Sequence, residues 1–414
     1  MSGDHDAIVV GSGPNGLVAA VRLAEAGQKV LVLEAASQVG GGMRTEELTL
    51  PGFRHDVCSS VHPLAIASPA FRALGLDREG LAFAHPEIPL GHPVDERTVA
   101  LLHRDVDETA ADLGRDGAAW RRLVGGVASL GQPLVDTLLS PLDLPPKAPL
   151  RLAAYGAVGA WPSDYVGRVA FREAPARALF AGLAAHAELK LTSLTTAGFG
   201  LLLGSLAHQV GWPVAVGGSQ SIADALVLRL RSLGGEVVTD HRVESLADLP
   251  PASSVVLDLT PRQVLAVGGD ALPPRYRDRL AKFRYGPGVF KVDWALDGPV
   301  PWRDERLAAA GTVHVCGTAA EVVVSERAAT SGGHAERPYV LFVQATAADP
   351  TRAPAGKHTG WAYCHVPNGS RVDMTDRIEA QIERFAPGFR DRILARSTMD
   401  TAALEAHNAN EVGG

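Results

Sequence analysis

The sequence predicts an α/β fold that, with its helical region and antiparallel sheet, is α+β overall. Three kinds of segment along the chain lead to this prediction. Apolar runs at 7–10 and 29–33 flank a helical run at 17–26, which together form a β-α-β unit. The region from about 105 to 211 is mostly helical and rich in Ala, Leu and Gly. Beyond residue 311, segments alternate apolar and polar residues, as the strands of an antiparallel sheet do.

The first turn of the β-α-β unit carries three glycines at the spacing G-x-G-x-x-G. Gly11 permits the tight turn, Gly13 lets the backbone approach a pyrophosphate, and Gly16 lets the helix pack closely against the strand. The free amides and the dipole at the helix start would hold the phosphates. The whole turn is therefore predicted to bind a cofactor: Gly11, Ser12, Gly13, Pro14, Asn15 and Gly16.

An acid ends the second strand, as a dinucleotide site requires. Glu34 would accept hydrogen bonds from the adenosine ribose hydroxyls. Ala35 follows it with no arginine nearby, which argues against a 2′-phosphate. We therefore predict a Rossmann-like site for FAD or NAD and count Ala35 among its cofactor-binding positions.

A second glycine cluster, at 40–42, bears on whether FAD or NAD is the cofactor. Backbone without Cβ atoms can pass close to a flat or charged ligand, and Arg44 can reach a pyrophosphate. A flexible loop is the alternative interpretation. The candidate cofactor-binding residues of this segment are Gly41, Gly42, Arg44 and Thr45.

These residues carry a resemblance to a known family. The turn at 11–16, Glu34 and the Gly-Gly-x-x-Arg-Thr element resemble the flavin-binding start of FAD-dependent oxidoreductases of the phytoene desaturase and amine oxidase type. Later segments are more specific and resemble phytoene-dehydrogenase-related oxidoreductases. These segments are 51–53, 216–219, 290–296, 361–367 and 404–408.

The resemblance implies FAD as the cofactor and two interleaved domains. A discontinuous FAD-binding domain would comprise 1–95 and 211–275, and a substrate or lid domain 96–210 and 276–400. The backbone of Val243 would contact the adenine, although a plain packing unit accounts for the same pattern.

Two residues after position 57 are candidates to lie near the flavin, because the family's chain passes the ring there. They are Ser60 and His62. The alternative is that His62 caps a helix that begins at Pro63.

The alternation of the segment 289–296 places Val289, Lys291 and Asp293 on one face. This segment resembles the amine oxidase strand whose lysine holds a water beside flavin N5, and Lys291 falls on that position. Lys291 is therefore the catalytic hypothesis. The alternative is a solvated strand lysine, since lysines are seldom buried.

Other elements follow from periodicity. A buried strand is expected at 253–259 and an amphipathic helix at 371–385. The remaining strands of the antiparallel sheet are expected at 312–325, 339–345, 358–366 and 393–399.

The family resemblance implies an FAD-dependent oxidoreductase of the dehydrogenase or desaturase type. Hydride would pass to flavin N5 from a small apolar organic substrate, with isoprenoid or carotenoid-like compounds as candidates. The helical region would cover the substrate, either as a tunnel for a lipid-like molecule or as plain helix core. A flavin amine oxidase-type enzyme is the alternative on the same scaffold.

Composition limits the size class, the partners and the cellular compartment that we expect for this chain. The chain has 414 residues, of which 46% are hydrophobic and 21% charged, so it is long enough for two or three cores. The net charge of −7 argues against a nucleic-acid partner. Three scattered cysteines predict a reducing compartment and no metal site. The acidic first residues resemble no signal peptide, so we expect a cytoplasmic protein with transient membrane contact if the substrate is lipid-like.

Relatives in the resembled family continue past the position of Gly414 with a segment that returns to the flavin. The expectation is an FAD site that a missing C-terminal segment or a second polypeptide completes. A non-catalytic FAD-fold protein that serves as a binding or assembly partner is the remaining alternative.

Overall fold

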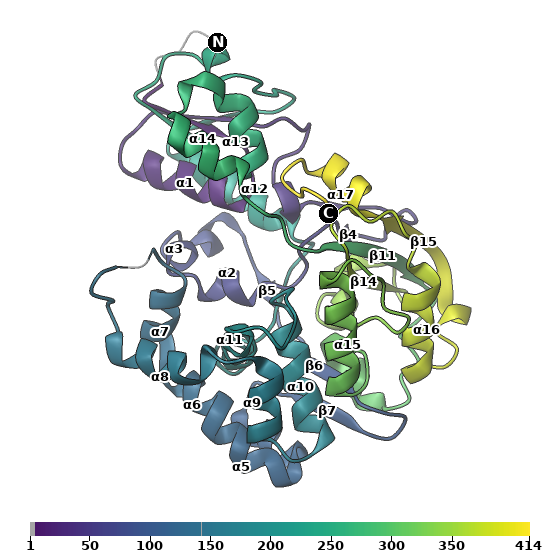
Figure 1. Cartoon of the computed structure of the whole chain (residues 1–414). Helices are drawn as coiled ribbons and strands as arrows, with labels where there is room; N and C mark the ends of the chain where they lie inside the picture. The colour runs from purple at the N-terminus through teal and green to yellow at the C-terminus, as the bar shows by residue number, and fades with distance from the viewer. Residues whose placement is uncertain (1–4, 142) are drawn as a thin grey trace.

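The computed structural model of this chain describes residues 5–141 and 143–414 (Figure 1). Its first sheet has four parallel strands in the order β10-β1-β2-β9. These strands are β1 (Ala7–Val10), β2 (Val30–Leu33), β9 (Glu236–Val238) and β10 (Ser254–Leu257). The predicted parallel β-α-β unit is confirmed.

The parallel sheet is buried because apolar clusters cover both of its faces. Val9 and Val32 pack against α1 (Pro14–Glu25) and α12 (Gln220–Ser232) on one face. Ile8 and Leu31 pack against Val267 of α13 (Pro261–Gly268) on the other face. The central strands β1 and β2 are therefore buried along their whole length, as their continuous apolar runs predict.

The expectation of a buried strand at 253–259 is wrong in its burial. Among the described residues, β10 is an edge strand whose one partner is β1, and its first two residues are exposed. An apolar run cannot distinguish an edge strand from a central one, because strand order is a property of the tertiary fold.

The second sheet has seven strands in the order β15-β11-β14-β13-β12-β6-β7. Neighbouring strands run antiparallel except β6 and β12, which are parallel. The predicted strands at 289–296, 358–366 and 393–399 are confirmed. The seven strands are β6 (Ile88–Pro93), β7 (Val99–Leu102), β11 (Gly288–Leu296), β12 (Ala310–Val315), β13 (Val340–Val343), β14 (His358–Val366) and β15 (Ile393–Met399).

One face of this sheet forms the largest apolar core around Trp294, Phe342 and Phe389. α16 (Thr375–Phe385) packs there through Ile378 and Ile382. Residues of the opposite face, such as Leu341 and Val343, border a large cavity.

The expected strand at 312–325 is wrong beyond Val315. β12 ends there, and α15 (Ala319–Thr330) follows. Thr318 and Glu321 form a capping box at the helix start, in which each side chain bonds the other residue's backbone N–H. The valine run 322–324 favours a strand by propensity, but the capping box and the tertiary packing select a helix.

The predicted helical region forms a lobe at the lower left of Figure 1. α10 and α11 lie at its centre, and Gly200 brings them close, because a Cβ there would lie 3.1 Å from the ring of Phe180. The helices are α4 (Val106–Asp112), α5 (Gly117–Trp120), α6 (Gly126–Ser129), α7 (Gly131–Leu138), α8 (Pro149–Gly159), α9 (Ser163–Ala170), α10 (Ala174–Ala185) and α11 (Thr196–Gln209).

The remaining elements join these parts. They are α2 (Pro63–Ala67), α3 (Pro69–Arg72), α14 (Pro274–Ala281), α17 (Thr401–His407) and two strand pairs, β3 (Thr45–Glu46) with β4 (His55–Asp56) and β5 (Phe83–Ala84) with β8 (Val214–Ala215). The chain has already entered the seven-stranded sheet at residue 88, because β6 begins there and pairs with β12. The expected domain boundary at 95 therefore falls inside the β6–β7 hairpin.

Within 5–141 and 143–414, no helix has the length and apolar character needed to cross a bilayer.

Candidate functional site

A cavity of about 1540 Å³ extends from the β1–α1 turn to the seven-stranded sheet. Pockets for a single small ligand usually measure about 300–1000 Å³, so this cavity has room for a dinucleotide and a second molecule. Most of the predicted cofactor-binding residues line it, whereas Gly16 and Thr45 do not. The lining residues among them are Gly11, Ser12, Gly13, Pro14, Asn15, Glu34, Ala35, Gly41, Gly42, Arg44 and Val243.

The turn at 11–16 forms a close-packed cradle, called the glycine cradle below. Its positions 11, 13 and 16 have room for no residue larger than glycine. Gly11 has φ +100°, in the left-handed region that favours glycine. Added Cβ atoms at Gly11 and Gly13 would lie 2.8 Å from atoms of Asp258, and one at Gly16 would lie 2.4 Å from the Gly11 carbonyl oxygen. Gly41 lies against the same turn, since its Cβ would be 3.1 Å from the Gly13 Cα. This close backbone packing fits the diphosphate of a dinucleotide.

Glu34 ties the end of β2 to the glycine turn. Its Oε2 accepts the backbone N–H of Ser12 at 2.9 Å and the Ser12 hydroxyl, while Oε1 accepts the Ala36 N–H at 2.8 Å. A carboxylate offers about four acceptor positions, so capacity remains for a ribose hydroxyl. The orientation of this side chain is fixed by the protein itself.

Arg44 is buried in the cavity wall, only 8% exposed. Its Nε donates to the Gly41 carbonyl at 3.1 Å, and Nη2 donates to the His407 carbonyl at 2.6 Å. The guanidinium thus joins the glycine segment to the end of α17. Its contact with a pyrophosphate stays a prediction.

Asp258 is a cavity residue outside the predicted cofactor-binding set. Its Oδ2 accepts the backbone N–H of Gly16 at 2.9 Å, directly under the glycine turn. Burial raises the pKa of this carboxyl, and the nearby charge of Glu34 raises it further. The available signal is its place at the carboxyl end of the parallel strand β10, where ligands of such sheets bind.

The other end of the cavity is apolar and aromatic. Strand register aligns Thr312 with Val343, Val343 with Trp361, and Leu341 with Tyr363, and all of these residues line the cavity. Residues of α11 and Trp212 contribute the other apolar walls. Only the tertiary structure brings these residues together, because they come from three strands and the helical lobe.

Lys291 is buried, only 2% exposed, so the alternative of a solvated strand lysine is wrong. Its amino group pairs with the carboxylate of Asp293 and lies 5.8 Å from the centroid of the Trp361 ring. Lys291 lines a second cavity of about 340 Å³. The lining residues that this cavity shares with the large one are Cys58, Trp361, Tyr363, Asn410 and Glu411. The predicted place of Lys291 beside a flavin remains a hypothesis.

The groups around the Lys291–Asp293 pair are also buried. Burial raises the pKa of Asp293 to about 6, against the opposing effect of Lys291. His55 lies behind Asp293, with 3.5 Å between its Nδ1 and the carboxylate Oδ1. Burial, together with the charges of Lys291 and Arg352, lowers the pKa of His55 to about 3, so this imidazole is neutral.

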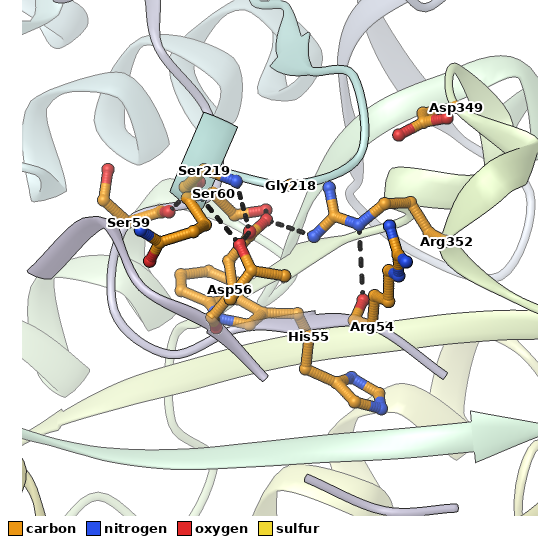
Figure 2. Close-up of polar contacts among 12 residues, drawn as sticks. Arg54, His55, Asp56, Ser59, Ser60, Gly218, Ser219, Asp349 and Arg352 are labelled. Carbon is orange, nitrogen blue, oxygen red and sulfur yellow. Dashed lines mark hydrogen bonds and ion pairs between the residues drawn. The ribbon is translucent and has the colours of Figure 1, made fainter. Parts of the chain in front are cut away.

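Figure 2 shows a buried polar hub around Asp56. Ser60 of this hub lines the cavity. The Asp56 carboxylate accepts a hydrogen bond from the Arg352 guanidinium at 2.5 Å. It accepts two more, from the Ser60 hydroxyl and the Ser219 N–H, at 2.8 Å each. The backbone carbonyl of Asp56 accepts the indole N–H of Trp361 at 2.8 Å. The hub therefore connects the segment after β4 to an aromatic wall of the cavity.

Both candidates of the segment after β4 line the large cavity. Ser60 does so while it donates to Asp56, and the Nε2 of His62 is 2.9 Å from the Ser219 hydroxyl. α2 begins at Pro63 as expected and His62 occupies its N-cap position, but the His62 side chain makes no capping hydrogen bond within the described residues. Burial lowers the pKa of His62 to about 4.

Known proteins resemble this chain over most of its length. A family described as an NAD(P)-binding Rossmann-like domain matches residues 9–74. Phytoene dehydrogenase of Streptomyces griseus is 30% identical over 425 aligned positions, which cover 95% of this chain and 78% of that protein. One of the limonene dehydrogenase polypeptides of Castellaniella defragrans is 32% identical over 110 residues, 27% of this chain and only 20% of that protein.

The fold also matches solved structures. Putrescine oxidase bound to putrescine superposes with a TM-score of 0.60 at 19% identity, over 97% of this chain and 85% of that one. At this identity the match speaks for the fold alone.

Proposed function

The chain belongs to the phytoene dehydrogenase family of FAD-dependent oxidoreductases, and we propose that it oxidises a C–H bond of a small apolar substrate, with isoprenoids as the leading candidates. The observation that supports this proposal is the continuity of the cavity. One end carries the glycine cradle, and the other end is walled by apolar and aromatic side chains such as Leu203, Leu341 and Val343. An apolar molecule gains affinity there by removing its surface from water.

The residues at the cradle end would hold FAD. The free amides at the start of α1 would bind the diphosphate, Glu34 would accept a ribose hydroxyl, and the backbone at Val243 would border the adenine. When bound, the flavin supplies the hydride acceptor. The chain's own part is to position the substrate against Trp361 and Tyr363 and to exclude water from the apolar end.

An amine oxidase-type activity is the second candidate, and one observation favours it. Trp361 and Tyr363 both line the cavity from β14, with ring centroids 5.4 Å apart and planes at 89°. An aromatic pair of this kind can hold an amine, because aromatic faces attract cations.

The two candidates differ in what reduces the bound flavin. The purified chain, loaded with FAD, is mixed without oxygen with an isoprenoid hydrocarbon or with putrescine, and flavin absorbance is followed. Bleaching by the hydrocarbon alone supports the first proposal, and bleaching by putrescine alone supports the second. A protein that binds FAD but is bleached by neither class contradicts both.

A further inference from the structure

The apolar end of the cavity contains a buried hydroxyl without a partner. Thr312 of β12 is only 1% exposed, and its Oγ1 makes no hydrogen bond within the described part of the chain. The residue lines the cavity on the same sheet face as Val343. A buried hydroxyl that stays unpaired is costly, so this position is suited to a ligand atom that completes the bond.

A second polar group of the cavity wall is linked to the strand that carries Thr312. His186, just after α10, lines the same cavity, and its Nε2 is 3.0 Å from the Nε2 of His314. His314 follows Thr312 by two residues on β12 and so shares its sheet face. The ring centroids of His186 and His314 are 5.1 Å apart.

These histidines are neutral. Burial lowers the pKa of His186 to about 3 and that of His314 well below its usual value. The Nδ1 of His314 has no partner within the described residues, and a buried unpaired N–H is rarer than an unpaired acceptor. The hydrogen-bond network therefore assigns the His314 proton to Nε2, which donates to His186 and leaves a proton on the Nδ1 of His186.

A neutral hydroxyl and a neutral imidazole select a particular ligand chemistry. They can bond an oxygen that accepts hydrogen bonds, but they cannot compensate a charge taken out of water. A carboxylate or ammonium group would therefore be rejected from this place.

We propose that the cavity binds an apolar substrate that carries one neutral oxygen function, a hydroxyl or a carbonyl, held by Thr312 and His186. This inference rests on the proposed function, because it specifies the apolar substrate at the same site.

The test compares ligands that differ only in their end group. Binding of decanol, decane, decanoate and decylamine is measured through tryptophan fluorescence, since Trp212 and Trp361 line the cavity. Decanol is expected to bind about tenfold more tightly than decane, the effect of one hydrogen bond, and both charged compounds more weakly than decanol.

Thr312→Val removes the hydroxyl with little change of shape, and it should reduce the preference for decanol over decane to near unity. Thr312→Ser should keep that preference. Thr359→Val is the matched control. Thr359 is also buried in the same sheet at 3% exposure, and its hydroxyl has no partner among the residues that the structure describes, but it does not line the cavity. That variant should bind like the original chain.

The outcomes separate the inference from the proposed function. Equal binding of decane and decanol, or a preference that Thr312→Val leaves intact, overturns the inference alone. Tightest binding of decylamine overturns it in favour of an amine ligand. Failure of all four compounds to bind contradicts the apolar-substrate proposal as well.

Discussion

Lys291 and Asp293 stand two residues apart on β11, and both side chains are buried on the same face of the sheet. Neither would be stable there alone, because a single buried charge has no compensation. Their pairing explains how a lysine can lie inside the sheet beside Trp361. A positive group at this place suits the catalytic hypothesis, since it would stabilise negative charge on a reduced cofactor.

Lys291→Met tests that hypothesis. If the amino group acts on the flavin, reoxidation of the reduced enzyme by oxygen should slow by roughly tenfold or more, about 1.4 kcal/mol in the barrier. The measurement is the return of flavin absorbance after rapid mixing with oxygen. The double variant Lys291→Met with Asp293→Leu is the control, because it removes both members of the buried pair. An unchanged rate in both variants would rule out a catalytic role for Lys291.

At the scale of elements, the hub around Asp56 connects segments that are distant in sequence. β4 contributes Asp56, the turn before α12 contributes Ser219, and the connection between β13 and β14 contributes Arg352. Burial alone would raise the pKa of Asp56, but the Arg352 guanidinium and the other donors hold it below its usual value. The hub is therefore an ionised cluster that fixes three segments of the chain beside the cavity.

Arg352→Met should lower the free energy of unfolding by about 3–5 kcal/mol, because it leaves the Asp56 carboxylate buried without its cationic partner. Chemical denaturation measures the change. Arg371→Met is the matched control, since Arg371 pairs with Asp400 at the surface and is 71% exposed. It should cost less than about 1 kcal/mol. Equal effects of the two substitutions would contradict the role assigned to the hub.

At the scale of the whole molecule, helix α15 is joined to the seven-stranded sheet by a buried ion pair. Glu326 of α15 contacts His365 of β14, with 2.8 Å between Oε2 and Nδ1. Burial would lower the pKa of His365, but the Glu326 carboxylate raises it to about 9. Because this pKa lies above the unfolded value of 6.5, the pair stabilises the fold at low pH.

The sign of the effect defines a measurable window. The stabilisation is fully present below pH 6.5 and is lost as the pH rises through about 9, a change of about 3 kcal/mol from this group. Denaturation curves across this range should show falling stability for the original chain and a flatter profile for His365→Gln. His92→Gln is the control, because burial lowers the pKa of His92 to about 4, outside the window. A flat profile for the original chain would contradict the assigned pairing.

Local sequence patterns predicted the β-α-β unit on which the glycine turn and Glu34 lie. The glycine turn and Glu34 are neighbours across β1 and β2, so a short stretch of chain contains their whole geometry. The later segments identified the family, which the similarity to phytoene dehydrogenase bears out. The bond of Asp258 to the turn was not predicted, because Asp258 reaches the turn only through the pairing of β10 with β1, more than two hundred residues apart.

The sequence by itself determined the parallel unit and the strands at 289–296, 358–366 and 393–399, since these depend on short-range periodicity. Its motifs also carried the resemblance that indicated the family of FAD-dependent oxidoreductases. Only the tertiary structure decided that Lys291 is buried, that 319–330 is a helix, and that Thr312 and His186 line one cavity. The physical reason is the same in each case. Burial and long-range pairing arise when distant segments exclude water together, and a local pattern carries no record of which segments those are.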